Sequence, residues 1–368
     1  MARIFRAPRF YIQGPDAIGM LGEKAATLGR SISVLCDAAV LEQLRPVLEE
    51  SLRRQDIVAE IIPFDGDVTL AEMDRLAVEV REGGGEVVVG VGGGRALDTA
   101  KGVARRNRLP FISVPTVAST DAPATRGVVI YDAAHRLAAV EQMDDNPAFV
   151  IVDTAIIAAA PARFLRGGIG DALSTKFEAE ANWAGAGLTK HGARPLLTGR
   201  LVADACYRTL VEHGPAAMRV AGTGEVTEDF EYAVEAVLLM SAIGFENTGL
   251  SVAHAIATEL GTIEDVRSHS LHGEHAAYGT LVQVVAEGRP AAEFLELHGF
   301  FGAVSLPRTL AELGLEQPIE AVVLRLAQAA AESPFMENQK APLAAERLAW
   351  AIRALEHGEA LDLPAISR

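Results

Sequence analysis

The sequence predicts an α/β domain built on a mostly parallel sheet, followed by an all-helical domain. Up to about residue 155, short β-branched runs alternate with helical patterns, as in βαβ units. After Pro161, Ala, Leu and Glu dominate, apolar residues recur at helical spacing, and no convincing strand is present. A length of 368 residues suits two domains of roughly 150 residues each. We place them at 1–160 and 161–368, divided where the segment APARF interrupts the pattern.

Five apolar runs of the first domain predict strands that pair in parallel. They are 31–37, 58–64, 86–91, 109–116 and 148–153. Helical stretches such as LEQLRPVLEESLRRQ and LAEMDRLAVEVREGG lie between them, and RFYIQGPDAI near the start is strand-like as well. The runs 127–132 and 137–143, separated by a short polar turn, predict a β-hairpin outside the parallel pairing. In the second half, 221–228 is predicted to be a loop between helices.

Composition and charge exclude several classes of protein. With 49% apolar and 22% charged residues, and no apolar run long enough to cross a bilayer, the chain is typical of soluble globular proteins. The N-terminus has no export signal, so we expect a cytoplasmic location. Two cysteines are too few for a disulfide framework. A net charge of −16 without a basic stripe disfavours nucleic acid and membrane surfaces, which leaves a small molecule as the expected partner.

The most informative segment of the first domain is a strand that runs directly into Gly92, Gly93 and Gly94 and then into a helix. Such a turn lets backbone N–H groups at a helix N-terminus approach a phosphate without a Cβ in the way. It matches neither the spaced Gly-x-Gly-x-x-Gly fingerprint nor the Walker pattern. A tight turn without a ligand is the alternative interpretation.

Two further loops favour a nucleotide. Asp37 ends a predicted strand, where its carboxylate can bind an adenosine ribose and repel a 2′-phosphate, which favours NAD over NADP. Alternatively, Asp37 caps the helix that follows it. The segment SVPTVASTDAP follows another strand and carries Asp121 to the edge where open α/β sheets bind ligands. We expect the three loops to converge there.

The helical domain contains residues that could bind a cation. They are Asp171, His254 and the cluster from Ser268 to His275, which includes His272. One Asp and two His with an open position suit a catalytic zinc, and equally iron(II). The long gaps between these residues match no local metal motif, so spacing alone does not define the site.

Several segments, in order and spacing, resemble the glycerol dehydrogenase branch of the iron-containing (group III) alcohol dehydrogenases. They are GVGGGRALDTAKGVA, SVPTVASTDAP, VIYD, FVIVDTAIIAAAPARFLRGGIGDALSTKFEA, GFENTGLSVAHAI and LHGEHAAYGTLVQ. The similarity covers essentially the whole chain. The resemblance implies a dehydroquinate-synthase-like architecture, with a nucleotide-binding α/β domain and a helical domain that binds metal and substrate. It also implies NAD as cofactor and a homo-oligomer, commonly an octamer.

By motif, Asp171, His254 and His272 align with the family's three protein ligands to the metal, which is usually zinc in this branch. The iron-dependent relatives have a further His four residues after the aspartate, and here that position is Thr175, so zinc is favoured over iron(II). The resemblance also assigns cofactor and substrate contacts. The cofactor contacts are Asp37, Gly92, Gly93, Gly94, Asp98, Thr116, Ser119, Thr125, Val129 and Tyr131, and the substrate contacts are Asp121, which is also a catalytic candidate, and Phe245.

The chain departs from the family pattern around the alcohol pocket. Ala257 and Glu259 replace a histidine and a glycine, so a proton relay through that histidine is absent. His275 replaces a lysine, and we hypothesise that it is a substitute proton carrier. Arg126 and Lys176 replace neutral residues and are either solvated charges or groups that favour an anionic substrate.

These features predict an NAD-dependent, zinc-containing dehydrogenase of glycerol or a similar vicinal diol or secondary alcohol. The first alternative is a hydroxycarboxylate or glycerol-1-phosphate dehydrogenase of the same family. A dehydroquinate-synthase-like cyclase is a second alternative, but it requires a conspicuous set of basic residues that the helical domain lacks. The third is an inactive nucleotide-binding scaffold.

Overall fold

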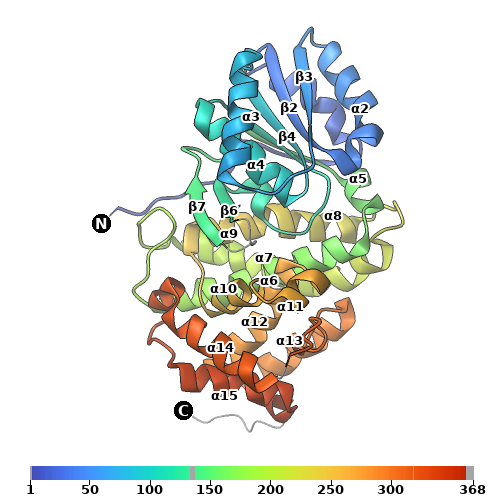
Figure 1. Cartoon of the computed structure of the whole chain (residues 1–368). Helices are drawn as coiled ribbons and strands as arrows, with labels where there is room; N and C mark the ends of the chain where they lie inside the picture. The colour runs from blue at the N-terminus through green and yellow to red at the C-terminus, as the bar shows by residue number, and fades with distance from the viewer. Residues whose placement is uncertain (1, 133–136, 318, 362–368) are drawn as a thin grey trace. The chain divides into compact units, whose positions relative to one another are not determined.

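The computed structural model describes residues 2–132, 137–317 and 319–361. These residues form two compact units (Figure 1). The first, Ala7–Ala162 with Val220–Leu239, is called the sheet unit here. The second is called the helical unit and contains the described parts of Met1–Arg6, Arg163–Arg219 and Met240–Arg368.

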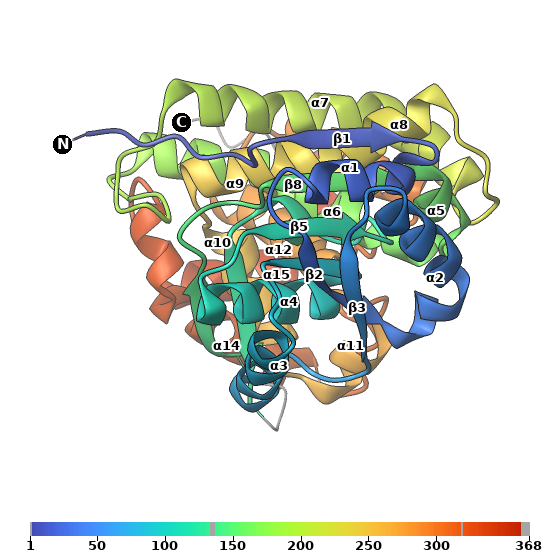
Figure 2. The same ribbon diagram turned by 90° about the horizontal axis from the view of Figure 1, so that it is seen from above.

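Six parallel strands form the main sheet of the sheet unit, in the order β1-β8-β5-β4-β2-β3. They are β1 (Tyr11–Gly14), β2 (Ser31–Asp37), β3 (Val58–Phe64), β4 (Val87–Gly92), β5 (Phe111–Pro115) and β8 (Phe149–Asp153). In Figure 2 the labels β1, β8, β5, β2 and β3 follow this order across the sheet. The predicted parallel strands are confirmed, and the strand-like segment near the start forms β1.

The predicted hairpin is also confirmed. Strands β6 (Gly127–Tyr131) and β7 (Leu137–Gln142) pair antiparallel in a separate two-stranded sheet. The turn predicted between them lies outside the described residues.

Helices cover both faces of the main sheet, because side chains alternate between its faces along each strand. On one face, Ile32, Val34 and Cys36 of β2 pack with apolar residues of η1 (Ala17–Met20), α1 (Leu21–Ala25) and α2 (Ala38–Arg53). On the other face, Leu35 and Val88 pack with α3 (Leu70–Glu82) and α4 (Gly94–Asn107). The sheet unit also contains η2 (Ala122–Ala124), α5 (Thr154–Ala159) and α8 (Glu228–Glu235). Such a three-layer arrangement is that of a doubly wound α/β fold.

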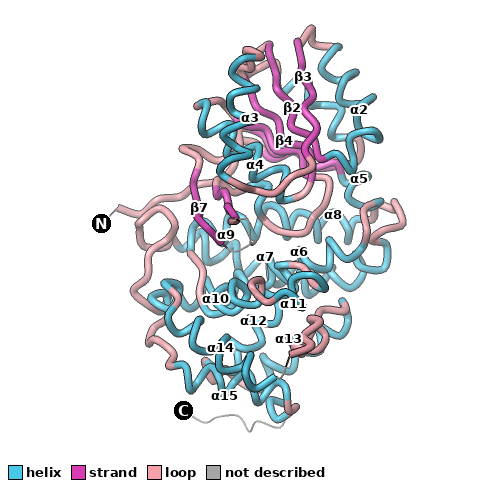
Figure 3. The backbone as a smooth tube through the Cα atoms, in the orientation of Figure 1, coloured by secondary structure: helices cyan, strands magenta, loops and turns pink. Residues whose placement is uncertain are grey.

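The helical unit contains none of the strands, which are magenta in Figure 3. This observation holds for its described residues and confirms the predicted all-helical half. Most of the π-helix η3 (Ala236–Met240) belongs to the sheet unit. The elements of the helical unit are α6 (Ala162–Ala184), α7 (Leu197–Val220), α9 (Ser241–Thr248), α10 (Val252–Leu260), α11 (Glu264–His269), α12 (His272–Ala286), α13 (Ala291–Val304), α14 (Ile319–Glu332), η4 (Pro334–Asn338), α15 (Ala345–Glu356) and η5 (Glu359–Leu361).

The centre of the helical unit is α12, in which every residue after the first is buried. Helix α10 packs along α12, and α14 packs against α15. Helix α6 is also largely buried, although it carries several polar side chains. Among the described helices, none is by itself both long and apolar enough to cross a bilayer.

Candidate functional site

Three polar side chains from distant parts of the sequence meet in the helical unit. Asp171 comes from α6, His254 from α10, and His272 is the first residue of α12. One potential ligand atom from each lies within 4.8 Å of the other two. The Nε2 atoms of His254 and His272 lie 3.5 and 3.8 Å from Oδ1 of Asp171. The structure therefore brings together the three residues predicted to bind a metal.

A close approach of α6 and α12 makes this meeting possible. Gly273 follows His272, and a Cβ at Gly273 would lie 1.9 Å from the carbonyl oxygen of Gly167 and 3.0 Å from Cβ of Asp171. Because only glycine fits there, the start of α12 can lie directly against the turn of α6 that carries the aspartate.

A fourth residue, Glu178 of α6, contacts His254 from the side opposite Asp171. Its Oε2 lies 2.7 Å from Nδ1 of His254, and its side chain is fully buried. Its Oε1 accepts hydrogen bonds from the backbone N–H groups of Ser251 at 2.6 Å and His254 at 3.0 Å. The sequence analysis missed this residue.

The charges around His254 favour a cation. Burial on its own would lower the pKa of His254, but the carboxylates of Glu178 and Asp171 outweigh burial and raise this pKa to about 10. Without a metal, the ring satisfies the two carboxylates by holding a proton. A divalent metal ion at Nε2 would supply the same positive charge, so metal and proton compete for this nitrogen.

The donor set fits zinc. Catalytic zinc sites commonly have three protein ligands from His, Asp or Glu and keep one position open. The side chain of His272 is 46% exposed, so the cluster is open on that side. Thr175 occupies the position of the family's fourth ligand, but its Oγ1 lies 3.1 Å from Oγ of Ser241 on α9. It thus contacts another hydroxyl within the helical core.

His275 lies one turn further along α12. It is 3% exposed, and its Nε2 lies 3.0 Å from Oγ of Ser270. Burial, assisted by nearby His272, lowers the pKa of His275 to about 3. The imidazole is therefore neutral at physiological pH, which gives no support to proton transfer by this ring. The predicted proton-carrier role remains a hypothesis.

The other departures from the family pattern have local partners. Lys176 forms ion pairs with Glu180 at 3.2 Å and Glu293 at 3.1 Å, so two carboxylates already neutralise it. Glu259 pairs with Arg325 and so links α10 to α14. In the sheet unit, Nη1 of Arg126 donates to the carbonyl of Met143. Ala257 is fully buried.

Within the sheet unit, the Gly-rich turn and Asp37 lie side by side. Oδ1 of Asp37 accepts a hydrogen bond from N–H of Ala39 at 3.0 Å, so the residue does cap α2. A Cβ at Gly92, whose φ is +146°, would lie 2.8 Å from Cβ of both Asp37 and Ala96. Glycine is needed at position 92 because the chain ends of β4 and β2 approach so closely.

The N-terminus of α4 lies at this point of the sheet. Gly93 is its N-cap residue and lacks a side-chain cap, and a Cβ at Gly94 would meet nothing within 4 Å. Packing therefore does not require glycine at 94, whereas a ligand that approaches the backbone would. Strands β2 and β4 are neighbours in the sheet, but the chain continues from β2 to β3 on one side and from β4 to β5 on the other. The carboxyl ends of β2 and β4 therefore form the topological switch point of the sheet, where such folds bind ligands.

The third predicted loop follows β5 next to β4. Thr116 donates its backbone N–H to the carbonyl of Gly92 at 3.1 Å, which joins this loop to the Gly-rich turn. Thr116 and Thr125 are buried, whereas Ser119 and Asp121 are partly exposed. The three loops thus converge at one edge of the sheet, as predicted.

A buried ion pair anchors the loop and the hairpin to α4. Lys101 is fully buried, and its Nζ donates to Oδ1 of Asp98 at 3.0 Å and to the carbonyls of Ala122 at 2.6 Å and Gly127 at 3.0 Å. Oδ2 of Asp98 accepts N–H of Val129 at 3.1 Å. Both oxygens of Asp98 thus have protein partners, which favours a supporting role beside the predicted cofactor contacts.

Tyr131 lies further along β6 and is partly exposed. It donates its backbone N–H to the carbonyl of Val68. Burial raises the pKa of the Tyr131 hydroxyl, and the carboxylate of Asp98 adds to this shift. The phenol is therefore a neutral donor at physiological pH.

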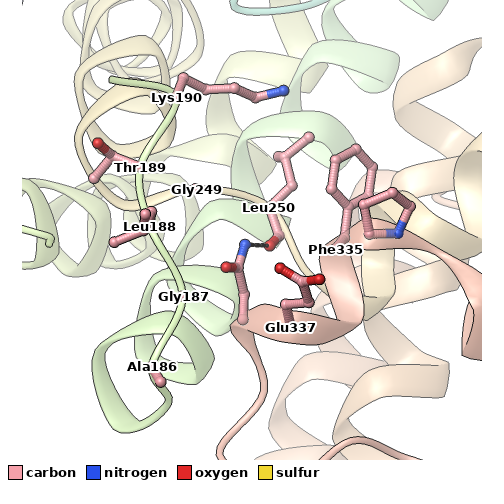
Figure 4. Close-up of a pocket in the computed structure, with 11 residues that line it drawn as sticks. Ala186, Gly187, Leu188, Thr189, Lys190, Gly249, Leu250, Phe335 and Glu337 are labelled. Carbon is pink, nitrogen blue, oxygen red and sulfur yellow. Dashed lines mark hydrogen bonds between the residues drawn. The ribbon is translucent and has the colours of Figure 1, made fainter. Parts of the chain in front are cut away.

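A pocket of about 440 Å³ lies in the helical unit, between residues 186–190, the turn at 249–250 and η4 (Figure 4). Nζ of Lys190 lies 5.4 Å from the ring centres of both Phe335 and Phe245. The predicted substrate contact Phe245 is thus partly exposed beside this pocket. The lining is mostly apolar, with residues such as Leu250 and Phe335, and it also includes the charged residues Lys190 and Glu337.

Comparisons of the sequence and of the structure with known proteins identify alcohol and glycerol dehydrogenases as relatives. Residues 8–154 match the family model described as iron-containing alcohol dehydrogenase. Glycerol dehydrogenase of Citrobacter freundii is 38% identical over 339 residues, covering 92% of this chain and 93% of that protein. Glycolaldehyde reductase of Halobacterium salinarum is 36% identical over 332 residues, covering 90% of this chain and 91% of that protein. The crystal structure of glycerol dehydrogenase from Schizosaccharomyces pombe has a TM-score of 0.93 at 34% identity, covering 100% of this chain and 94% of that one.

Proposed function

The chain belongs to the iron-containing alcohol dehydrogenase family and is an oxidoreductase, and from this premise we propose that it is an NAD-dependent, zinc-containing dehydrogenase. Its proposed substrate is glycerol or a similar vicinal diol or secondary alcohol, which it oxidises to the ketone. The cyclase and the inactive scaffold lose their support, because the relatives are named as dehydrogenases and reductases.

The observation that carries the proposal is the cluster of Asp171, His254 and His272, with one ligand atom from each within 4.8 Å of the others. These residues would hold the zinc ion. A zinc ion bound there would lower the pKa of the alcohol hydroxyl and favour the alkoxide from which a hydride leaves. The carboxylate of Asp171 reduces the net charge of the site, and Glu178 holds the ring of His254 in place.

The proposed nucleotide site is the edge of the sheet where the three loops converge. N–H groups at the start of α4 would bind the pyrophosphate, and Asp37 would bind the ribose and disfavour a 2′-phosphate. NAD, when bound, accepts the hydride. Thr116, Ser119, Thr125, Val129 and Tyr131 are proposed to line the same site, with Asp98 behind them. In this proposal residues 1–160 bind the nucleotide, and 161–368 bind the metal and substrate.

A vicinal pair of oxygens is the proposed recognition feature of the substrate. Glycerol and glycolaldehyde, which appear in the names of two relatives, both carry oxygens on adjacent carbons. We propose that Asp121 accepts a hydrogen bond from a substrate hydroxyl and that Phe245 lines the pocket. A hydroxy acid or glycerol phosphate is the weaker candidate, because Lys176 is already paired with two carboxylates.

The proposal is tested by measuring NAD⁺ reduction with glycerol, 1,2-propanediol, 2,3-butanediol, hydroxy acids and glycerol phosphates, with and without added zinc. We expect turnover with the diols, NADH formed in proportion to alcohol consumed, and loss of activity after metal removal that zinc restores. Turnover confined to the anionic substrates would contradict the substrate proposal. Undiminished turnover in metal-free protein would contradict the metal proposal. Light scattering tests the expected homo-oligomer.

A further inference from the structure

We propose that Glu178 is a positioning residue that fixes the tautomer and orientation of His254, so that Nε2 of this ring is the atom offered to the metal. The inference rests on the proposed metal function and deepens it, because it names the residue that prepares one of the ligands.

The contacts of Glu178 define what it can do. It lies on α6 two turns after Asp171, so both side chains lie on the same face of the helix. Its carboxylate meets three N–H positions: the backbone of Ser251 and of His254 on Oε1, and Nδ1 of His254 on Oε2. The side chain is completely buried, so no solvent competes for these bonds.

The tautomer follows from the chemistry of the two groups. A carboxylate only accepts hydrogen bonds, so Nδ1 of His254 must carry the proton. In the neutral ring, the lone pair is then on Nε2, which lies 3.5 Å from Oδ1 of Asp171. Ligating histidines commonly donate their other N–H to a carboxylate in this way, which fixes the ring and raises its basicity.

Glu178 also caps α10, and this second role must be separated from the first. Two N–H groups at the start of this helix bind its Oε1, while a third, of Ala253, binds Oε1 of Gln283. A residue that acted only as a cap would affect the stability of α10 and leave the affinity for metal unchanged.

Glu178→Gln separates these possibilities. Its amide offers one oxygen and one NH₂ group in place of two oxygens. If the amide oxygen keeps its hydrogen bonds with the backbone N–H groups, the amide NH₂ group faces Nδ1 of His254. Nδ1 must then accept a hydrogen bond, so the proton of the neutral ring lies on Nε2. We expect zinc and cobalt(II) affinity, measured by competition with a chelator, to fall roughly 10- to 100-fold.

Two control variants match this change. Glu180→Gln makes the same substitution on the same helix, at a carboxylate that pairs with Arg289 and Lys176. Gln283→Met removes a cap of α10 without touching the ring of His254. Both are expected to bind metal within about twofold of wild type. Equal loss of affinity in Gln283→Met and Glu178→Gln would reduce Glu178 to a cap and overturn the inference.

A measurement on the wild-type protein keeps the inference testable if Glu178→Gln does not fold. In cadmium-loaded protein with isotope-labelled histidine, one-bond cadmium–nitrogen coupling should appear at Nε2 of His254, with a proton on Nδ1. Coupling at Nδ1 would overturn the role of Glu178 while leaving the metal function intact. Wild-type protein that binds no zinc, cobalt or cadmium would contradict the proposed metal function together with this inference.

Discussion

Lys101→Met tests how the loops of the proposed nucleotide site are held. The substitution keeps much of the volume of the side chain but removes the ammonium, and so all three hydrogen bonds from Nζ to Asp98, Ala122 and Gly127. Asp98, which is 7% exposed, is then left without its cationic partner.

The expected loss of stability arises because the substitution removes only one partner of a buried ion pair. Removal of one partner leaves an uncompensated buried charge and costs about 3–5 kcal/mol. For a domain of this size, each kcal/mol lowers the midpoint of thermal unfolding by roughly 2–4 °C, so a fall of about 6–20 °C is expected. Neutralising Asp98 as well should relieve part of this cost, by at least about 1 kcal/mol in a double-mutant cycle.

Urea and thermal unfolding followed by circular dichroism measure these effects, and steady-state kinetics add a functional readout. Because the loop and hairpin carry the proposed cofactor contacts, the KM for NAD should rise more than the KM for the alcohol. Lys24→Met is the control: Lys24 pairs on the surface with Glu23, and its loss should cost less than about 1 kcal/mol. The reasoning is refuted if Lys101→Met costs no more than Lys24→Met, or if the effects of Lys101→Met and Asp98→Asn are simply additive.

Further predictions concern the three candidate metal ligands, Asp37 and His275. Asp171→Asn, His254→Ala and His272→Ala should each lower kcat/KM by at least roughly 100-fold, because each removes a proposed ligand; near-normal rates in zinc-free samples of all three would contradict the metal site. Asp37→Ser should improve kcat/KM with NADP relative to NAD, because the carboxylate that repels a 2′-phosphate is removed; an unchanged ratio would leave only the capping role seen at Ala39. The pKa of His275 is about 3 in the folded protein and about 6.5 in the unfolded chain. As the pH falls below about 6.5, the unfolded chain therefore binds a proton that the folded protein does not, and the free energy of unfolding decreases. Between about pH 7 and pH 5 this loss of stability amounts to about 2 kcal/mol. His275→Gln should remove this part of the pH dependence, as measured by urea unfolding at the two pH values. An equal loss of stability in the variant would show that His275 is not the group responsible. A pH–rate profile left unchanged in His275→Ala would count against its proton-carrier role.

Much of the sheet unit was predictable because strand patterns are local. The runs 31–37 and 58–64 both carry several β-branched residues, and their predicted limits match β2 and β3. The association of Val220–Leu239 with the sheet unit could not be predicted from a local pattern. This segment contains the predicted loop 221–228 and then an ordinary helical pattern, and no periodicity indicates which unit a helix packs against.

The candidate metal ligands show the same contrast between what local sequence motifs predict and what depends on the packing of distant helices. Asp171, His254 and His272 could be chosen through a resemblance of ordered motifs, whereas their meeting depends on how α6, α10 and α12 pack. Glu178 was missed because a single glutamate in a helix is most often exposed. A usable signal was present: Asp171, Thr175, Glu178 and Asn182 recur at helical spacing on α6, where all four are buried. A polar stripe on a buried helix requires partners, and here one of these partners is His254.

Anomalous diffraction at the zinc absorption edge tests the central claim most directly. Crystals of zinc-loaded protein should show one dominant peak per chain, about 2.0–2.2 Å from a carboxylate oxygen of Asp171 and from Nε2 of both His254 and His272. The absence of a peak among these three side chains, with zinc bound elsewhere or not at all, would contradict it.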